Sequence, residues 1–93
     1  MNTVWKYRIE VEKTGSLNVL LPIDAKVIFV ACREPHIMSF WVELDPDRIR
    51  VLRKFNVYGT GHLIPEDLNG YSYHHCGSCL DGEFVWHLYE WRN

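Results

Sequence analysis

The segment Tyr58-Gly59-Thr60-Gly61-His62 is the sharpest local signal for chemistry in the sequence. Glycines on both sides of the threonine permit positive φ, so successive backbone N–H groups can converge on one point. His62 adds an imidazole that donates a hydrogen bond or carries charge beside an anion. We therefore expect a ligand site here, formed by Tyr58, Gly59, Thr60, Gly61 and His62. The alternative is hairpin geometry alone, with His62 satisfying a buried carbonyl.

Aromatic and cationic side chains elsewhere are the expected partners of this turn. The chain carries four Trp, five Tyr and four Phe, more than a small domain buries easily. Trp5, Tyr7 and Trp41 are expected to offer stacking faces for a base, and Arg50 to neutralise a phosphate. In the alternative interpretation, the aromatics form the core and the seam of a homo-oligomer while the arginines are solvated.

A second candidate is a zinc site in a short run of soft ligands: His74, His75, Cys76 and Cys79. Zinc accepts sulfur and nitrogen ligands tetrahedrally, but this CxxC run is only half of a site. Completion would need His62, His87 or a neighbouring chain. The alternative is two free thiols near a turn.

Catalytic motifs are weak in this sequence. Thr60 and His62 are close enough in the sequence to be considered as a nucleophile–base dyad, but no GxSxG-type signature supports it. The acid pairs Asp45/Asp47 and Glu66/Asp67 are typical of turns and loops. We therefore expect binding without catalysis, and no cofactor.

The size and net charge of the chain limit the number of domains and the kinds of partner it can bind. Ninety-three residues correspond to one domain, residues 1–93, and the net charge of −2 argues against a binder of long nucleic acids. No apolar run approaches the ~20 residues that span a bilayer, so no membrane partner is expected. Three cysteines without a secretory apolar segment predict free thiols in a reducing cytosol.

Hydrophobic alternation predicts an all-β fold, a small antiparallel β-sandwich or barrel of six to seven strands. The expected strands are 4–11, 17–21, 26–32, 37–44, 48–58, 71–75 and 83–91. Strand 26–32 is apolar on both sides, which favours a central position. A β-bulge is expected near Leu52 and Arg53, where the alternation breaks; a helix over 47–55, with Asp47 as N-cap, is the alternative.

Four segments in this order resemble a family of small bacteriophage proteins known mainly as a domain of unknown function. They are Trp5-Lys6-Tyr7, Trp41 with Asp45-Pro46-Asp47, the Tyr58–His62 turn and the closing run Gly82–Glu90. The resemblance covers nearly the full length of the chain. The run His74–Cys79 lies outside the family pattern, which weakens zinc as a shared function.

The resemblance implies a phage accessory protein of the host cytoplasm, a setting in which small proteins often counter host defence. We expect a homo-oligomer that sequesters a small phosphorylated or nucleotide-derived immune signal. The alternative is an inhibitor that binds a host defence protein through an exposed aromatic patch.

Overall fold

The computed structural model describes residues 1–66 and 70–93, and its regular elements are seven β-strands. They are β1 (Thr3–Glu10), β2 (Ser16–Pro22), β3 (Lys26–Glu34), β4 (Ile37–Leu44), β5 (Arg50–Gly59), β6 (Ser72–Asp81) and β7 (Phe84–Arg92). All seven expected strands are present, whereas the alternative helix over 47–55 is wrong because β5 occupies most of it. Across the described residues, no helix is long and apolar enough to cross a membrane.

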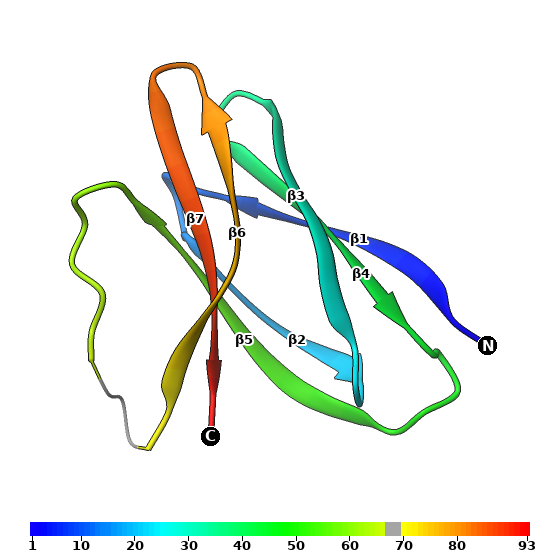
Figure 1. Ribbon diagram of the computed structural model, residues 1–93. Helices are drawn as coiled ribbons and strands as arrows, with labels where there is room; N and C mark the ends of the chain where they lie inside the picture. The colour runs from blue at the N-terminus through cyan, green and yellow to red at the C-terminus, as the bar shows by residue number, and fades with distance from the viewer. Residues whose placement is uncertain (67–69) are drawn as a thin grey trace.

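The strands form two antiparallel sheets packed against each other, as Figure 1 shows. One sheet has three strands in the order β1-β4-β3, and the other has four in the order β2-β5-β7-β6. Both sheets bury one face and leave the other toward solvent, which explains the alternating polarity of β1 and β4. The expected all-β sandwich is confirmed.

The core lies between the two sheets. Met38, Phe40, Val42 and Leu44 of β4 are buried on one face, while Trp41 lies on the opposite face, as the alternation predicts. Phe40 meets Phe55 of the other sheet, with ring centroids 5.0 Å apart. Contacts of this kind hold the sheets together by removing apolar area from water.

The connections follow the turn signals in the sequence. At the predicted 45–47 turn, the Arg48 N–H donates to the Asp45 carbonyl at 3.2 Å and the Asp47 N–H to Asp45 Oδ1 at 3.1 Å. The segment between the expected strands 48–58 and 71–75 contains no strand from residue 60 to residue 70 in its described part. Asp67, Leu68 and Asn69 lie outside the described residues, and with them one member of the Glu66/Asp67 pair.

The predicted central position of strand 26–32 is wrong. β3 is an edge strand of the three-stranded sheet, and β4 occupies the middle. Ile28 and Phe29 are about half exposed, and the β3–β4 register shifts between Val27 and Phe29. A strand with apolar residues on both faces can pair with one neighbouring strand or with two. The apolar run in 26–32 therefore did not determine the position of β3 in its sheet.

The β-bulge predicted near Leu52 and Arg53 is also wrong. The β2–β5 register runs without a shift from Ser16 opposite Asn56 to Pro22 opposite Arg50. Arg53 keeps its inward direction because it pairs with a buried carboxylate on β7, Glu90. The broken alternation therefore marks a buried ion pair in a regular strand.

A bulge does occur in β6, between His75 and Gly77. The strand expected over 71–75 consequently continues through Cys76 and Cys79, and the chain reverses after Asp81. The extra residue places His75 and Ser78 opposite Tyr89 and His87, on the outer face of the four-stranded sheet. Cys76 and Cys79 instead pack against the core.

Candidate functional site

The Gly59–His62 turn is closed by its own hydrogen bonds. The Gly59 N–H donates to His62 Nδ1 at 2.9 Å, and the His62 N–H donates to the Gly59 carbonyl at 3.0 Å. The Thr60 N–H donates to the Val85 carbonyl at 3.3 Å. These three amides therefore do not converge on an anion. Because Nδ1 is an acceptor, a neutral His62 carries its proton on Nε2, a donor on an exposed ring.

Steric constraints explain why both Gly59 and Gly61 are glycine. Gly61 has φ of +90°, in the left-handed region that side chains rarely adopt. A Cβ on Gly59 would lie 3.0 Å from the His62 ring and 3.1 Å from the Trp86 ring. Because Gly59 has no side chain, the backbone of the turn packs closely against Trp86. The turn therefore lies beside the β6–β7 hairpin.

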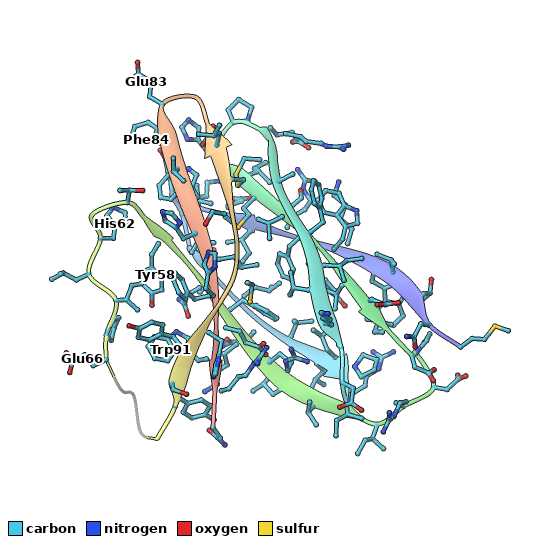
Figure 2. The ribbon with its side chains drawn as sticks, in the orientation of Figure 1. Tyr58, His62, Glu66, Glu83, Phe84 and Trp91 are labelled. Carbon is cyan, nitrogen blue, oxygen red and sulfur yellow. A yellow bond between two sulfur atoms is a disulfide. The ribbon has the colours of Figure 1, made fainter. Side chains whose placement is uncertain are left out.

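A hollow of about 380 Å³ lies between the turn and this hairpin. Its lining consists of Gly59, Thr60, His62, Glu83, Phe84, Val85 and Trp86. Figure 2 shows Glu83 and Phe84 near the hairpin tip, with His62 on the neighbouring turn. Phe84 is 59% exposed although its ring stacks on buried Trp86, with centroids 6.1 Å apart. The hollow thus combines an accessible aromatic face, an imidazole donor and a carboxylate acceptor.

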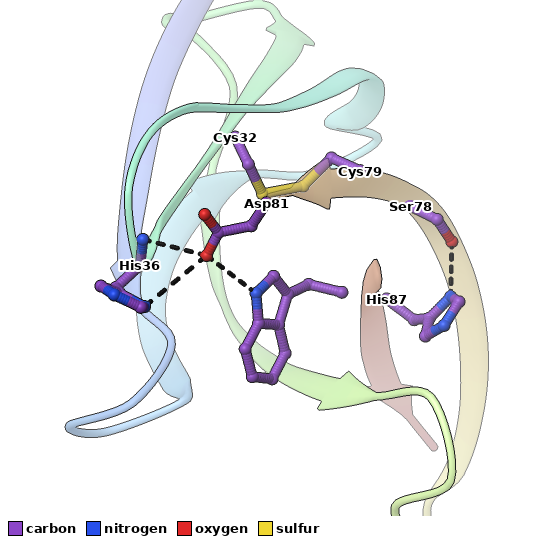
Figure 3. The surroundings of a disulfide bond; sticks show 7 residues. Cys32, His36, Ser78, Cys79, Asp81 and His87 are labelled. Atoms are coloured by element: carbon purple, nitrogen blue, oxygen red, sulfur yellow. Dashed lines mark hydrogen bonds and ion pairs between the residues drawn. A yellow bond between two sulfur atoms is a disulfide. The ribbon is translucent and has the colours of Figure 1, made fainter. Parts of the chain in front are cut away.

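Asp81 holds Trp86, one of the residues that line this hollow. Its Oδ2 accepts a hydrogen bond from Trp86 Nε1 at 3.1 Å and another from the His36 backbone N–H at 3.0 Å (Figure 3). The second bond reaches the turn between β3 and β4, so the carboxylate ties the two sheets at this end. The orientation of Trp86 is therefore fixed by a hydrogen bond within the chain.

A chain of polar side chains leads from Thr60 across the outer face of the four-stranded sheet. Thr60 Oγ1 lies 2.9 Å from His87 Nε2, and Ser78 Oγ lies 2.7 Å from His87 Nδ1. Ser78 Oγ also lies 2.9 Å from His75 Nε2. Thr60 thus partners His87, whereas the dyad considered from sequence was Thr60 with His62.

The other predicted ligand residues are not gathered at the turn. Trp5 and Tyr7 project from β1 toward the core, where Trp5 packs against the Arg50 guanidinium at 5.4 Å. The Tyr7 ring stacks on Phe40 at 5.7 Å, and burial raises the pKa of Tyr7 although the charge of Arg50 opposes this. These three side chains serve packing between the sheets.

Trp41 lies on the outer face of the three-stranded sheet, and Tyr58 on the outer face of the other sheet, with the core between them. Phe29 packs beside Trp41 with ring centroids 5.4 Å apart. The cations of Lys6 and Arg33 lie 5.4 and 5.7 Å from the Trp41 ring. The aromatics singled out from sequence therefore belong to separate surfaces.

The cysteines correct the expectation of free thiols. Cys32 of β3 and Cys79 of β6 form a disulfide between the two sheets (Figure 3), and Cys76 is the free cysteine. Burial raises the pKa of Cys76 to about 11, so it is a neutral thiol near pH 7. Cys79 cannot bind zinc while bonded to Cys32, and His75 faces away from the core. Within the described residues, no three His, Cys, Asp or Glu side chains gather as a metal site.

Breaking this disulfide is expected to lower the free energy of unfolding by about 2–4 kcal/mol. The bond joins residues 47 apart and so restricts the unfolded chain strongly. The measurement is urea unfolding with and without a phosphine reductant, beside thiol titration of the unfolded chain. The Cys32→Ser/Cys79→Ser protein is the control, because reductant should leave its midpoint unchanged. Equal midpoints for oxidised and reduced wild type would contradict the expectation.

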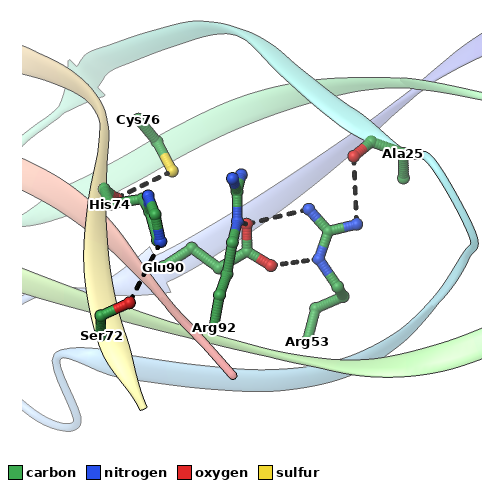
Figure 4. Close-up of polar contacts among 7 residues, drawn as sticks. All are labelled: Ala25, Arg53, Ser72, His74, Cys76, Glu90 and Arg92. Carbon is green, nitrogen blue, oxygen red and sulfur yellow. Dashed lines mark hydrogen bonds and ion pairs between the residues drawn. The ribbon is translucent and has the colours of Figure 1, made fainter.

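Another hollow, of about 430 Å³, opens over a buried ion pair. Glu90 is 1% exposed, and Arg53 donates to its two carboxylate oxygens (Figure 4). Arg53 Nη1 also donates to the Ala25 carbonyl at 3.0 Å, and Arg92 Nε donates to Glu90 Oε1 at 3.0 Å. Both guanidiniums hydrogen-bond to the single carboxylate of Glu90, so this hollow lies over a polar cluster that is paired within the chain.

A family model described as Domain of unknown function (DUF7352) matches residues 1–93. The chain belongs to this family. No curated protein and no solved structure gives a significant match to the chain.

Sequence reasoning missed two features of this DUF7352 chain. His87 and Ser78 were not expected to meet, because they lie nine residues apart and only the β6 bulge turns Ser78 outward. The Arg53–Glu90 pair was also missed. The sequence does contain a signal for such a pair. Arg53 occupies a position of the alternation that should face the core, and a charged residue there is expected to have a buried partner.

Proposed function

We propose that this protein is a bacteriophage accessory protein that sequesters a small nucleotide-derived ligand in the host cytoplasm, without catalysis. The observation that carries the proposal is the hollow between the Gly59–His62 turn and the β6–β7 hairpin. Its volume of about 380 Å³ is in the range of small-ligand sites. The phage assignment rests on the resemblance of the Trp5, Trp41, Gly59–His62 and Gly82–Glu90 segments to small phage proteins.

The chemistry of the hollow suits a base better than a phosphate. The exposed face of Phe84 is available for stacking. His62 Nε2–H can donate to a ring nitrogen or carbonyl, and Glu83 can accept from an exocyclic amine. Among the described residues, the lining contains no lysine or arginine. We therefore assign the phosphate to cations of a second copy, which makes the proposed sequestering species a homo-oligomer.

Phe84→Ala is expected to weaken ligand binding about 5- to 150-fold, the loss of about 1–3 kcal/mol of stacking. Calorimetry with a panel of cyclic dinucleotides and ADP-ribose-type compounds measures this, after a thermal-shift screen selects the ligand. Phe29→Ala is the matched control, because Phe29 is similarly exposed but lies on the other sheet. Both variants should fold, since neither ring is in the core.

The same experiment tests the absence of catalysis. The bound compound is released by heating and analysed by mass spectrometry, and it should be chemically unchanged. An altered product would overturn that part of the proposal. No thermal shift across the panel would overturn the sequestration proposal.

One observation favours the alternative, inhibition of a host defence protein. Phe29 and Ile28 are about half exposed beside Trp41, and the cations of Lys6 and Arg33 flank that ring. Aromatic and arginine side chains of this kind dominate protein interfaces. If this face is the functional one, Phe29→Ala abolishes capture of a host protein and Phe84→Ala leaves it intact.

A further inference from the structure

The outer face of the β6–β7 hairpin carries two imidazoles that aim at one point. His75 Nε2 and His87 Nδ1 lie 2.9 and 2.7 Å from the same atom, Ser78 Oγ. The two rings come from neighbouring strands, and their centroids are 6.3 Å apart. This convergence depends on the β6 bulge between His75 and Gly77, because residues three apart in a regular strand face opposite sides.

The imidazole of His87 is held in the orientation that a metal ligand needs. Thr60 Oγ1 lies 2.9 Å from Nε2, where the hydroxyl can accept the ring N–H. With the proton on Nε2, the lone pair of Nδ1 points toward Ser78. Such a partner on the far nitrogen is the usual companion of a metal-bound histidine. Thr60 of the Gly59–His62 turn would then orient His87, a role that does not require an anion.

The second imidazole is restrained by packing. The Tyr89 ring lies 5.2 Å from the His75 ring, and Tyr89 is packed in turn against Tyr58 at 5.9 Å. His75 and Ser78 are nevertheless exposed, so an ion can reach them from solvent. Within the described residues, neither His75 nor His87 has an ion pair with a carboxylate that would compete for it.

We propose that His75 and His87 bind a divalent transition-metal ion of the imidazole-preferring class, Cu(II) or Zn(II), at the point where Ser78 Oγ now lies. Metal–nitrogen bonds are about 2.0–2.1 Å, so each ring nitrogen moves inward by less than about 1 Å once Ser78 rotates away. Imidazole suits both ions, and copper binds more tightly in the general order of divalent metals. Water completes the coordination.

Titration with Cu(II) tests the proposal, with Cys76→Ser as the parent so that copper cannot oxidise the free thiol. One ion should bind per chain, and its electron paramagnetic resonance spectrum should show coupling to two imidazole nitrogens. His75→Ala should weaken binding at least about 10-fold. His74→Ala is the matched control, because this neighbouring histidine lies on the other side of β6, and it should leave the affinity unchanged.

Thr60→Val adds a readout for the orienting contact. Loss of the hydroxyl should weaken copper binding about 10-fold while the two-nitrogen spectrum persists. Phe84→Ala should bind copper as the parent does, which separates this site from the proposed ligand site. A spectrum with one nitrogen or none, or equal affinities for His75→Ala and His74→Ala, would overturn the proposal.

Discussion

Replacing Glu90 with alanine is expected to lower the free energy of unfolding by about 3–5 kcal/mol. Glu90 is 1% exposed, and its carboxylate accepts hydrogen bonds from both Arg53 and Arg92. Its removal leaves the guanidinium of Arg53, itself 14% exposed, without a counter-charge between the sheets. An unpaired buried charge costs more than the original pair contributed. Urea unfolding at neutral pH measures the loss.

Glu43→Ala is the matched control for this variant. Glu43 is an exposed carboxylate in β4, so its removal should change stability by no more than about 0.5 kcal/mol. Equal unfolding midpoints for Glu90→Ala and Glu43→Ala would contradict the importance of the buried pair.

The same residue gives stability a defined pH dependence. Burial raises the pKa of Glu90, but the hydrogen bonds and charge of Arg53, with those of Arg92, outweigh it, and the net pKa is lowered from 4.5. The contribution is therefore complete above about pH 4.5 and is lost as pH falls through the lower folded-state value. In unfolding experiments below about pH 4.5, wild type should lose stability more steeply than Glu90→Gln. Parallel curves would contradict this.

Phe55→Ala is expected to cost about 3–5 kcal/mol, the range for removing a buried phenylalanine. Phe55 is fully buried and meets Phe40 across the two sheets at 5.0 Å. Hydrogen-bonded strands on both sides prevent the sheets from closing on the cavity, so the lost contacts are not recovered. For a domain of this size, such a loss is a large share of the total stability.

Phe84→Ala provides the comparison for Phe55→Ala. It removes the same side chain from a position that is 59% exposed, and it should change stability by no more than about 0.5 kcal/mol. The pair separates folding from binding: Phe55→Ala should reduce stability, whereas Phe84→Ala should reduce ligand affinity. A large stability loss in Phe84→Ala would mean that the hollow belongs to the core.

The β-strands could be predicted from the sequence because alternation is a local property. Each of the residues Tyr7, Ile9 and Val11 differs in polarity from both of its neighbours, and that pattern needs no knowledge of the partner strand. The turn at Gly59–His62 was predicted for the same reason, since glycine permits positive φ. Gly61 adopts it, at +90°, whereas Gly59 does not. The turn's closure by its own imidazole was not evident from the sequence, because that bond depends on how the ring folds back.

Strand order, the disulfide and the grouping of side chains were decided by the tertiary structure. Cys32 and Cys79 are 47 residues apart and meet only because β3 and β6 face each other across the sheets. The bulge in β6 reverses the directions of the residues after His75, which sends Ser78 outward and Cys79 inward. A single extra residue changes the face of every later side chain, and no local pattern of polarity records it.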